Sequence, residues 1–329
     1  MLYDLKLDIA YDFARPLGAG RQLLRVLPAR LPGRQEVIRE RLDISPTPQE
    51  RREFTDFFGT RVVEIAMPAG LTEFRLSMTA RIRREAEVAE LDLSPAPSAL
   101  AQELAAQLSL GPVSPHHFLG PSPRIPRIEA IAAFARKATA GTETLRQAVD
   151  RLGAALHDRM IFDAEATEVD TPPDTAFALR RGVCQDFAQI MIAGLRSLGI
   201  PAAYVAGYLR TLPPPGKPRM EGADAMHAWV AAWCGAEMGW VDHDPTNDCW
   251  VGTDHVTVGM GRDYGDVAPI TGVLRTDGGQ SSRLTVDFRE AGTAAAAKLP
   301  DPGPVRPGAA PAKAADAAPP QAGASRPAG

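Results

Sequence analysis

Cysteine is scarce in this chain: the 329 residues include three, Cys184, Cys234 and Cys249. So small and odd a set does not suit the dense disulfide framework of a secreted domain, and it indicates reduced thiols. Charged side chains interrupt the start of the chain, so it lacks the continuous apolar stretch of a signal peptide. We therefore expect a cytoplasmic protein.

Long apolar runs and an excess of positive charge are also missing. No run of about 18 apolar residues occurs, so we expect no membrane-spanning helix and no membrane partner. The formal net charge of −4 argues against a protein that binds nucleic acid through bulk positive charge. Hydrophobic residues still make up 45% of the chain, which is enough for ordinary globular cores, and the length suggests two domains. The sequence does not indicate an oligomeric state.

The first 85 residues show the alternation of apolar and polar side chains that is typical of half-buried strands. Residues 1–12 and 74–83 carry this pattern most clearly. Shorter stretches of β character, separated by proline and glycine, lie near 21–27, 36–44 and 60–67. We predict that residues 1–85 form a small antiparallel β domain.

Residues 127–290 are predicted to form an α+β domain, in which helices pack on an antiparallel sheet. Helical signals come first, at 127–139, 143–158 and 183–199. Strand signals follow at 202–210, 226–233 and 239–243.

Two regions flank this domain. Residues 86–126 are rich in proline and predict an interdomain connection, with a short helix that carries Leu100, Leu104 and Leu108 at four-residue spacing. Residues 291–329 are rich in alanine and proline and poor in large apolar side chains. We expect this tail to be disordered, because it cannot bury enough surface to offset its conformational entropy.

Three segments carry side chains suited to thiol chemistry: GVCQDF at 182–187, MHAW at 226–229 and WVDHDPTN at 240–247. Cys184 lies in the first turn of a predicted helix, where unpaired N–H groups and the positive end of the dipole favour a thiolate. His227, within a predicted strand, could act as its base, and a carboxylate on a neighbouring strand could orient that imidazole. Asp242 and Asp244 are two residues apart and share one face of a strand, so the pattern alone does not choose between them.

Other interpretations of these residues are simpler. A lone cysteine is usually a small buried apolar residue, and we expect this of Cys234 and Cys249. A zinc site built from these two thiols with His243 and His255 would lack the paired spacing of structural zinc sites, so we predict no metal. His243 points away from the face shared by the two aspartates. The tryptophans nearby, Trp229 and Trp240 among them, either pack in the core or line a substrate groove.

At these residues the sequence resembles the transglutaminase-like superfamily, which has a papain-like fold and a Cys-His-Asp triad. GVCQDFA, HAWVAAW and GWVDHDPTN match its motifs in order and spacing, and GRDYGDVAPITG at 261–272 resembles its bacterial branch. The segments YDFARP, LRVLP, ISPTP and DFFGT are similar to the small β domain that precedes the catalytic domain in that branch. The resemblance implies Cys184 as nucleophile, His227 as base and then acid, and Asp244, directly before Pro-Thr, as the group that orients the imidazole.

The reaction implied by the resemblance is acyl transfer through a Cys184 thioester. With water as acceptor the protein would be a cysteine peptidase or amidase, and with an amine it would be a crosslinking transglutaminase. We favour hydrolysis, because a cytoplasmic crosslinking enzyme would threaten its own proteome. A non-catalytic binding scaffold is the alternative from another class, against which the complete triad argues.

The partner that these interpretations imply is a peptide or protein substrate. We expect no cofactor and no calcium site, because no acidic loop with calcium-ligand spacing is visible. The backbone N–H of Cys184 should be one oxyanion-hole donor, and the second is not identifiable. Candidates for the substrate groove are Gln185, Trp229, Trp240 and Asp242. The N-terminal β domain is expected to shape or cover that groove, or to recruit a partner.

Overall fold

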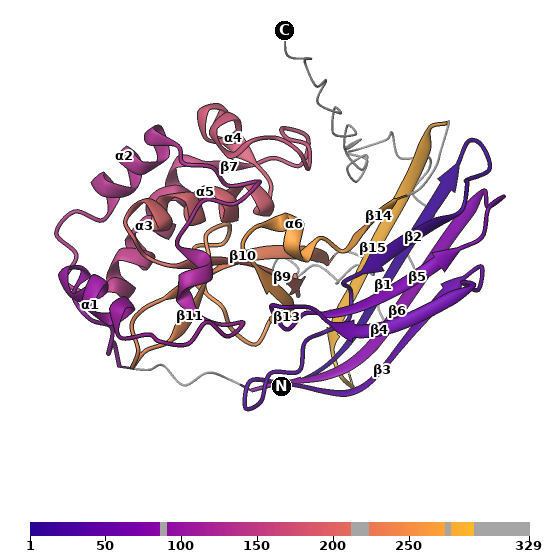
Figure 1. The fold of residues 1–329 in the computed structure, drawn as a ribbon, viewed down its shortest axis with the longest axis horizontal. Coiled ribbons are helices and arrows are strands. Elements are labelled where there is room, and N and C mark those ends of the chain that lie inside the picture. Colours follow the sequence, from indigo (N-terminus) through magenta and orange to yellow (C-terminus); the bar gives the residue numbers. More distant parts are fainter. Residues whose placement is uncertain (86–90, 212–223, 274–277, 293–329) are drawn as a thin grey trace, which may run out of the picture.

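Two four-stranded antiparallel sheets pack face to face in the N-terminal part of the protein (Figure 1). The computed structural model describes residues 1–85, 91–211, 224–273 and 278–292. The strand order is β15-β1-β6-β3 in one sheet and β14-β2-β5-β4 in the other. The strands from the first 85 residues are β1 (Leu2–Phe13), β2 (Gly20–Leu24), β3 (Gln35–Ser45), β4 (Glu50–Thr55), β5 (Arg61–Met67) and β6 (Glu73–Arg84). The apolar row of β1, which includes Tyr3, Leu5 and Leu7, is buried between the sheets, as its alternation predicts.

The last two strands correct the predicted division of the chain. β14 (Ile270–Val273) pairs with β2, and β15 (Gln280–Glu290) pairs with β1 over its length, although both were expected to belong to the domain at 127–290. Val286 and Phe288 of β15 complete the core between the N-terminal sheets. Alternation along a strand indicates which face is buried but carries no information on which partner strand it joins, so the sequence could not assign them.

The connection is ordered where the structure describes it, from residue 91 onward. It contains η1 (Pro97–Ala99), α1 (Leu100–Ala105) and η2 (Pro115–Phe118), and a proline begins each of the two 3-10 turns. The predicted short helix is present but ends before Leu108, which is 90% exposed. The prediction of disorder for 291–329 concerns residues that, after 292, lie outside the described part of the chain.

The predicted α+β domain is confirmed: helices cover one face of a five-stranded antiparallel sheet with the order β12-β11-β10-β9-β13. These strands are β9 (Ala202–Leu209), β10 (Ala225–Trp233), β11 (Trp240–Asp244), β12 (Cys249–Trp250) and β13 (His255–Gly261). The helices are α2 (Glu129–Ala138), α3 (Leu145–Arg159), α4 (Pro173–Leu179), α5 (Cys184–Ser197) and α6 (Tyr264–Val267). A short parallel pair, β7 (Ile161–Phe162) with β8 (Arg181–Gly182), precedes α5. Within the described residues, none of the helices combines the length and apolarity needed to cross a membrane.

The five-stranded sheet lies between the helices and the N-terminal sheets (Figure 1). α5 is deeply buried, and α2, α3 and α4 pack against it (Figure 1). On the other side, Tyr208, Val256 and Val258 from β9 and β13 join the core of the N-terminal sheets. The two parts of the protein therefore share an apolar interface, which fixes the N-terminal sheets against β9 and β13.

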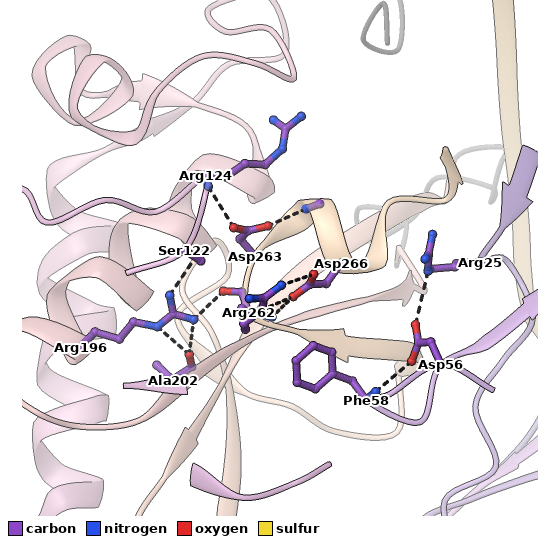
Figure 2. A network of polar contacts seen from close by, with 11 residues as sticks. Arg25, Asp56, Phe58, Ser122, Arg124, Arg196, Ala202, Arg262, Asp263 and Asp266 are labelled. Atoms are coloured by element: carbon purple, nitrogen blue, oxygen red, sulfur yellow. Dashed lines mark hydrogen bonds and ion pairs between the residues drawn. The ribbon is translucent and has the colours of Figure 1, made fainter. Parts of the chain in front are cut away.

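Polar contacts anchor the GRDYGDV segment at this junction (Figure 2). The guanidinium of Arg196, from α5, donates hydrogen bonds to the carbonyl oxygens of Ala202 and Arg262. Asp263 accepts hydrogen bonds from the backbone N–H groups of Arg124 and Gly265, and it thereby caps α6. The segment that resembles the bacterial branch therefore joins the connection, α5 and the end of β13.

Gly207 in β9 lies opposite His227 in β10, and its lack of a side chain leaves room for the Trp229 ring beside it. A Cβ atom at Gly207 would lie 2.3 Å from the Val256 carbonyl oxygen and 2.4 Å from Cη2 of Trp229. We expect Gly207→Ala to lower the free energy of unfolding by about 3 kcal/mol, because backbone and a fully buried ring must both move. Urea denaturation measures this change. Gly120→Ala is the control, since a Cβ there meets nothing within 4 Å, and equal midpoints for the two variants would contradict the argument.

Candidate active site

Cys184 is the first residue of α5, half-buried, with its thiol at the positive end of the helix. The turn before it is fixed by Asp186, whose Oδ2 accepts hydrogen bonds from the Val183 N–H at 2.8 Å and the Thr167 hydroxyl at 2.6 Å. Burial raises the pKa of the Asp186 carboxyl. A Cβ at Gly182 would come within 2.4 Å of Oδ2 of Asp186, so only glycine fits there. Two residues of the GVCQDF motif thus serve to hold the third in place.

His227 lies on β10 between the thiol and a carboxylate. Its Nε2 atom is 2.7 Å from Oδ2 of Asp244, which leaves Nδ1 as the ring nitrogen for the hydrogen bond with Cys184. Burial disfavours the charged imidazolium, but the charge of Cys184 and the hydrogen bonds of Asp244 and Cys184 outweigh it. Together they raise the pKa of His227 to about 10. The geometry therefore supports a thiolate–imidazolium pair.

Asp244, the last residue of β11, is fully buried, and both of its carboxylate oxygens accept hydrogen bonds. Oδ1 accepts from the backbone N–H groups of Thr246 and Asn247 at 2.9 and 3.2 Å. Oδ2 faces the Asn247 amide at 2.7 Å, His227 at 2.7 Å and His255 at 3.1 Å. Burial alone would raise the pKa of this carboxyl, but its hydrogen bonds from the two histidines hold it well below the usual range. The carboxylate is therefore ionised and immobile.

Asp242, the alternative carboxylate, takes no part in this cluster. Its Oδ2 lies 3.3 Å from a guanidinium nitrogen of Arg34, in the loop before β3. Strand alternation did not distinguish the two aspartates, but their partners in the structure do. Asp244 faces the imidazole, and Asp242 binds the N-terminal part of the protein.

The residues expected to line a groove have defined contacts. Gln185 is buried and donates through Nε2 to the Val169 carbonyl oxygen at 2.8 Å, and Trp229 is fully buried with its ring edge-on to His255 at 5.3 Å between centroids. These two do not line an open groove, because their neighbours cover them. Trp240 is half-buried and donates to the Val113 carbonyl oxygen at 3.0 Å. For Trp240 and Asp242 a role in the groove stays a prediction.

The other thiols and His243 do not join into a zinc site in the described part of the chain. Burial raises the pKa of Cys234 to about 12 and, with nearby carboxylates, that of Cys249 to about 11. Burial also lowers the pKa of His243, whose ring packs against Gly153 of α3 and against Trp250. The expectation of a small buried residue is met at Cys234, whereas Cys249 is half-buried.

His255 also belongs to this site, although from the sequence it was considered only as a possible zinc ligand. Its signal in the sequence is its place at the start of the strand before GRDYGDV, within reach of the DPTN segment. His227, Asp244 and His255 bring their ligand atoms within 4.8 Å of one another, which is close enough for a metal ion. The Gly252 N–H, however, donates to Nδ1 of His255 at 3.4 Å, which fits the tautomer whose Nε2–H donates to Oδ2 of Asp244. Oδ2 of Asp244 already accepts hydrogen bonds from both rings and from the Asn247 amide, so these groups fit hydrogen bonding better than metal binding.

Comparisons with known proteins show the family to which this arrangement belongs. Residues 132–245 match the family model of the transglutaminase-like superfamily, and residues 3–83 match that of the bacterial transglutaminase-like N-terminal region. The uncharacterized protein Rv2569c of Mycobacterium tuberculosis H37Rv is 34% identical over 257 residues, which cover 74% of this chain and 78% of that protein. A protein-glutamine gamma-glutamyltransferase of Pseudomonas aeruginosa is 36% identical over 124 residues, 37% of this chain and 18% of that enzyme.

One solved structure has the same fold over most of its length. It is that of a candidate cysteine protease from Cytophaga hutchinsonii, with a TM-score of 0.68 and 24% sequence identity. The match covers 92% of this chain and 94% of the other, so it includes the N-terminal sheets as well as the domain that carries the triad.

Proposed function

The chain belongs to the transglutaminase-like superfamily, and we propose on this basis that it catalyses acyl transfer from peptide or carboxamide substrates through a thioester on Cys184. The observation that carries the proposal is the cluster of a helix-start thiol, a buried imidazole and an ionised carboxylate. Thiol, base and orienting group lie in one line of hydrogen bonds, which is the arrangement that activates a nucleophile.

In the first half of the reaction the Cys184 thiolate attacks the substrate carbonyl carbon. A C–S bond forms, and the carbonyl π electrons move to oxygen, where the Cys184 backbone N–H at the start of α5 stabilises the negative charge. The tetrahedral intermediate then expels the amine, which takes the proton from the imidazolium of His227. A thioester and a neutral imidazole remain.

In the second half an acceptor attacks the thioester while His227 removes its proton. Water yields a carboxylic acid and restores the thiolate–imidazolium pair, and we propose this hydrolytic outcome, as a cysteine peptidase or amidase, for this protein. An amine acceptor would yield a new amide instead. The similarity to the Pseudomonas aeruginosa glutamyltransferase over 124 residues favours this as the second candidate.

The experiment that tests the proposal uses 4-nitrophenyl acetate as a minimal acyl donor. Wild-type protein should release 4-nitrophenol and carry one acetyl group on Cys184, located by peptide mass spectrometry. Adding hydroxylamine, with water as the competitor, then measures how the thioester partitions between the two acceptors. Absence of acetyl-Cys184 in folded protein would overturn the proposal, and predominant hydroxamate at low amine concentration would favour transamidation over hydrolysis.

The raised pKa of His227 predicts how activity depends on alkaline pH. The leaving amine needs a proton from the imidazolium, and that proton is retained until the pH rises through about 10. Release of 4-nitroaniline from glutaminyl and peptidyl 4-nitroanilides should therefore hold steady from neutral pH and decline only near pH 10. A decline near pH 6.5, where an ordinary histidine loses its proton, would contradict this.

A further inference from the structure

A second imidazole lies against the carboxylate oxygen that binds His227. Nε2 of His255 is 3.1 Å from Oδ2 of Asp244, and the His255 side chain is buried at the start of β13. Since the Gly252 N–H occupies Nδ1, the His255 ring donates to Asp244 through Nε2. His255 and the Asn247 amide thus fix the orientation of Oδ2, the atom that in turn orients His227.

The loop that holds His255 is itself held by the N-terminal sheets. Arg84, the last residue of β6, is 1% exposed, and its Nη2 donates to the Gly252 carbonyl oxygen at 3.1 Å. Its Nη1 donates to the Arg34 carbonyl oxygen at 3.2 Å. A buried guanidinium is costly unless it is hydrogen-bonded, so the carbonyl oxygens of Arg34 and Gly252 stabilise Arg84 at this position. In return, Arg84 holds the Gly252 loop against the N-terminal sheets.

These contacts form one continuous path. It runs from Arg84 to the carbonyl oxygen of Gly252, from the N–H of the same residue to His255, then to Asp244 and His227, and it ends at Cys184. The path crosses from the N-terminal sheets to the nucleophile: its contacts at Gly252 are partly buried, and those of Asp244 with His255 and His227 are buried.

We propose that His255 and Arg84 are positioning residues for the triad: through them the N-terminal β domain fixes the orientation of Asp244 and thereby of His227. This inference rests on the proposed function. It assigns the N-terminal sheets a role in assembling the catalytic groups, beside the expectation that they shape or cover the groove or recruit a partner. Without His255, one of the donors that hold Oδ2 is lost and the carboxylate can rotate away from the imidazole.

The groups around His255 are few. Asp244 faces it from β11 and His227 from β10, and the Trp229 ring packs edge-on against it. On the loop side, Asp254 is bound by Arg210 at 2.7 Å and by the Tyr3 hydroxyl at 3.2 Å. Asp244 is therefore the charged partner of the His255 Nε2–H.

The test measures alkylation of Cys184 by iodoacetamide between about pH 5 and pH 9 in the full chain. In His255→Leu we expect alkylation at pH 6 to slow by about tenfold. The pH below which the alkylation rate falls should rise by about one pH unit. His255→Gln, whose amide nitrogen can take the place of Nε2, should restore the rate to within about threefold. Arg84→Met should also slow the reaction, by about three- to tenfold.

Two further comparisons separate positioning from general stability. Arg81→Met is the matched control, because Arg81 lies on the same strand but pairs with Asp4 through two 2.7 Å hydrogen bonds on the other face, and its profile should match wild type. Adding Arg84→Met to His255→Leu should slow alkylation no further, since both act along one path. Where Arg84→Met fails to fold, Arg84→Lys replaces it, because lysine has one nitrogen in place of the two guanidinium nitrogens that separately bind the carbonyl oxygens of Arg34 and Gly252.

The outcomes for this inference and for the proposed function differ. A wild-type profile without low-pH reactivity would overturn the proposed function itself. A reactive wild type whose His255→Leu and Arg84 variants keep its profile would overturn the positioning role alone. So would a loss in those variants that tracks their melting temperature and is not restored in His255→Gln.

Discussion

Replacing Cys184 by alanine is expected to abolish acyl-enzyme formation and to lower turnover of amide substrates by at least about 10³-fold. The expectation follows from where the thiol lies, at the start of α5 and in hydrogen-bond contact with a charged imidazole. No other thiol can substitute for it, because burial holds Cys234 and Cys249 in the neutral form at physiological pH.

The measurement is 4-nitroanilide turnover, together with peptide mass spectrometry after incubation with 4-nitrophenyl acetate. Cys234→Ala serves as the matched control, because Cys234 is a buried thiol at the start of the turn after β10 and lies apart from the triad. We expect the control to keep turnover within about twofold, with at most a modest loss of stability. Retention of acyl transfer by Cys184→Ala would show that another residue is the nucleophile.

The second large effect is expected at Asp244. Asp244→Asn should lower turnover by about 10²- to 10⁴-fold, because the group facing Nε2 of His227 would lose its charge and could present an N–H to another N–H. The remaining donors around this position, from Thr246 and Asn247, are arranged for a carboxylate and would hold the new amide in an unfavourable orientation.

Asp242→Asn provides the comparison from the same strand. Asp242 pairs with Arg34, so its replacement should leave turnover within about threefold and cost at most about 1 kcal/mol of stability. Steady-state kinetics on both variants measures the contrast. If Asp242→Asn lost more activity than Asp244→Asn, the assignment of the orienting carboxylate would be reversed.

Much of this molecule could be predicted because the signals are local. Alternation in β1 indicated the buried face, glycine and proline marked the end of α5, and the spacing of three motifs placed a thiol, an imidazole and a carboxylate in one domain. The superfamily itself was identified from those same motifs.

The features that escaped prediction depend on long-range pairing. The pairing of β15 with β1 joins residues nearly the whole chain apart, and the contact of Arg84 with Gly252 joins residues 168 positions apart. In the sequence, His255 is a single histidine at the start of an apolar strand, and only the folded structure shows its contact with Asp244. Strand partners and second contacts on a buried carboxylate are set by tertiary packing, for which a single sequence carries no local pattern.

The central claim is that Cys184 and His227 form a thiolate–imidazolium pair, and the rate of iodoacetamide alkylation of each cysteine against pH tests it most directly. The account predicts that Cys184 reacts rapidly down to about pH 5–6, that His227→Ala loses this low-pH reactivity, and that Cys234 and Cys249 react slowly throughout. A Cys184 that gains reactivity only near pH 8.5, unchanged in His227→Ala, would contradict the account and favour a binding scaffold over an enzyme.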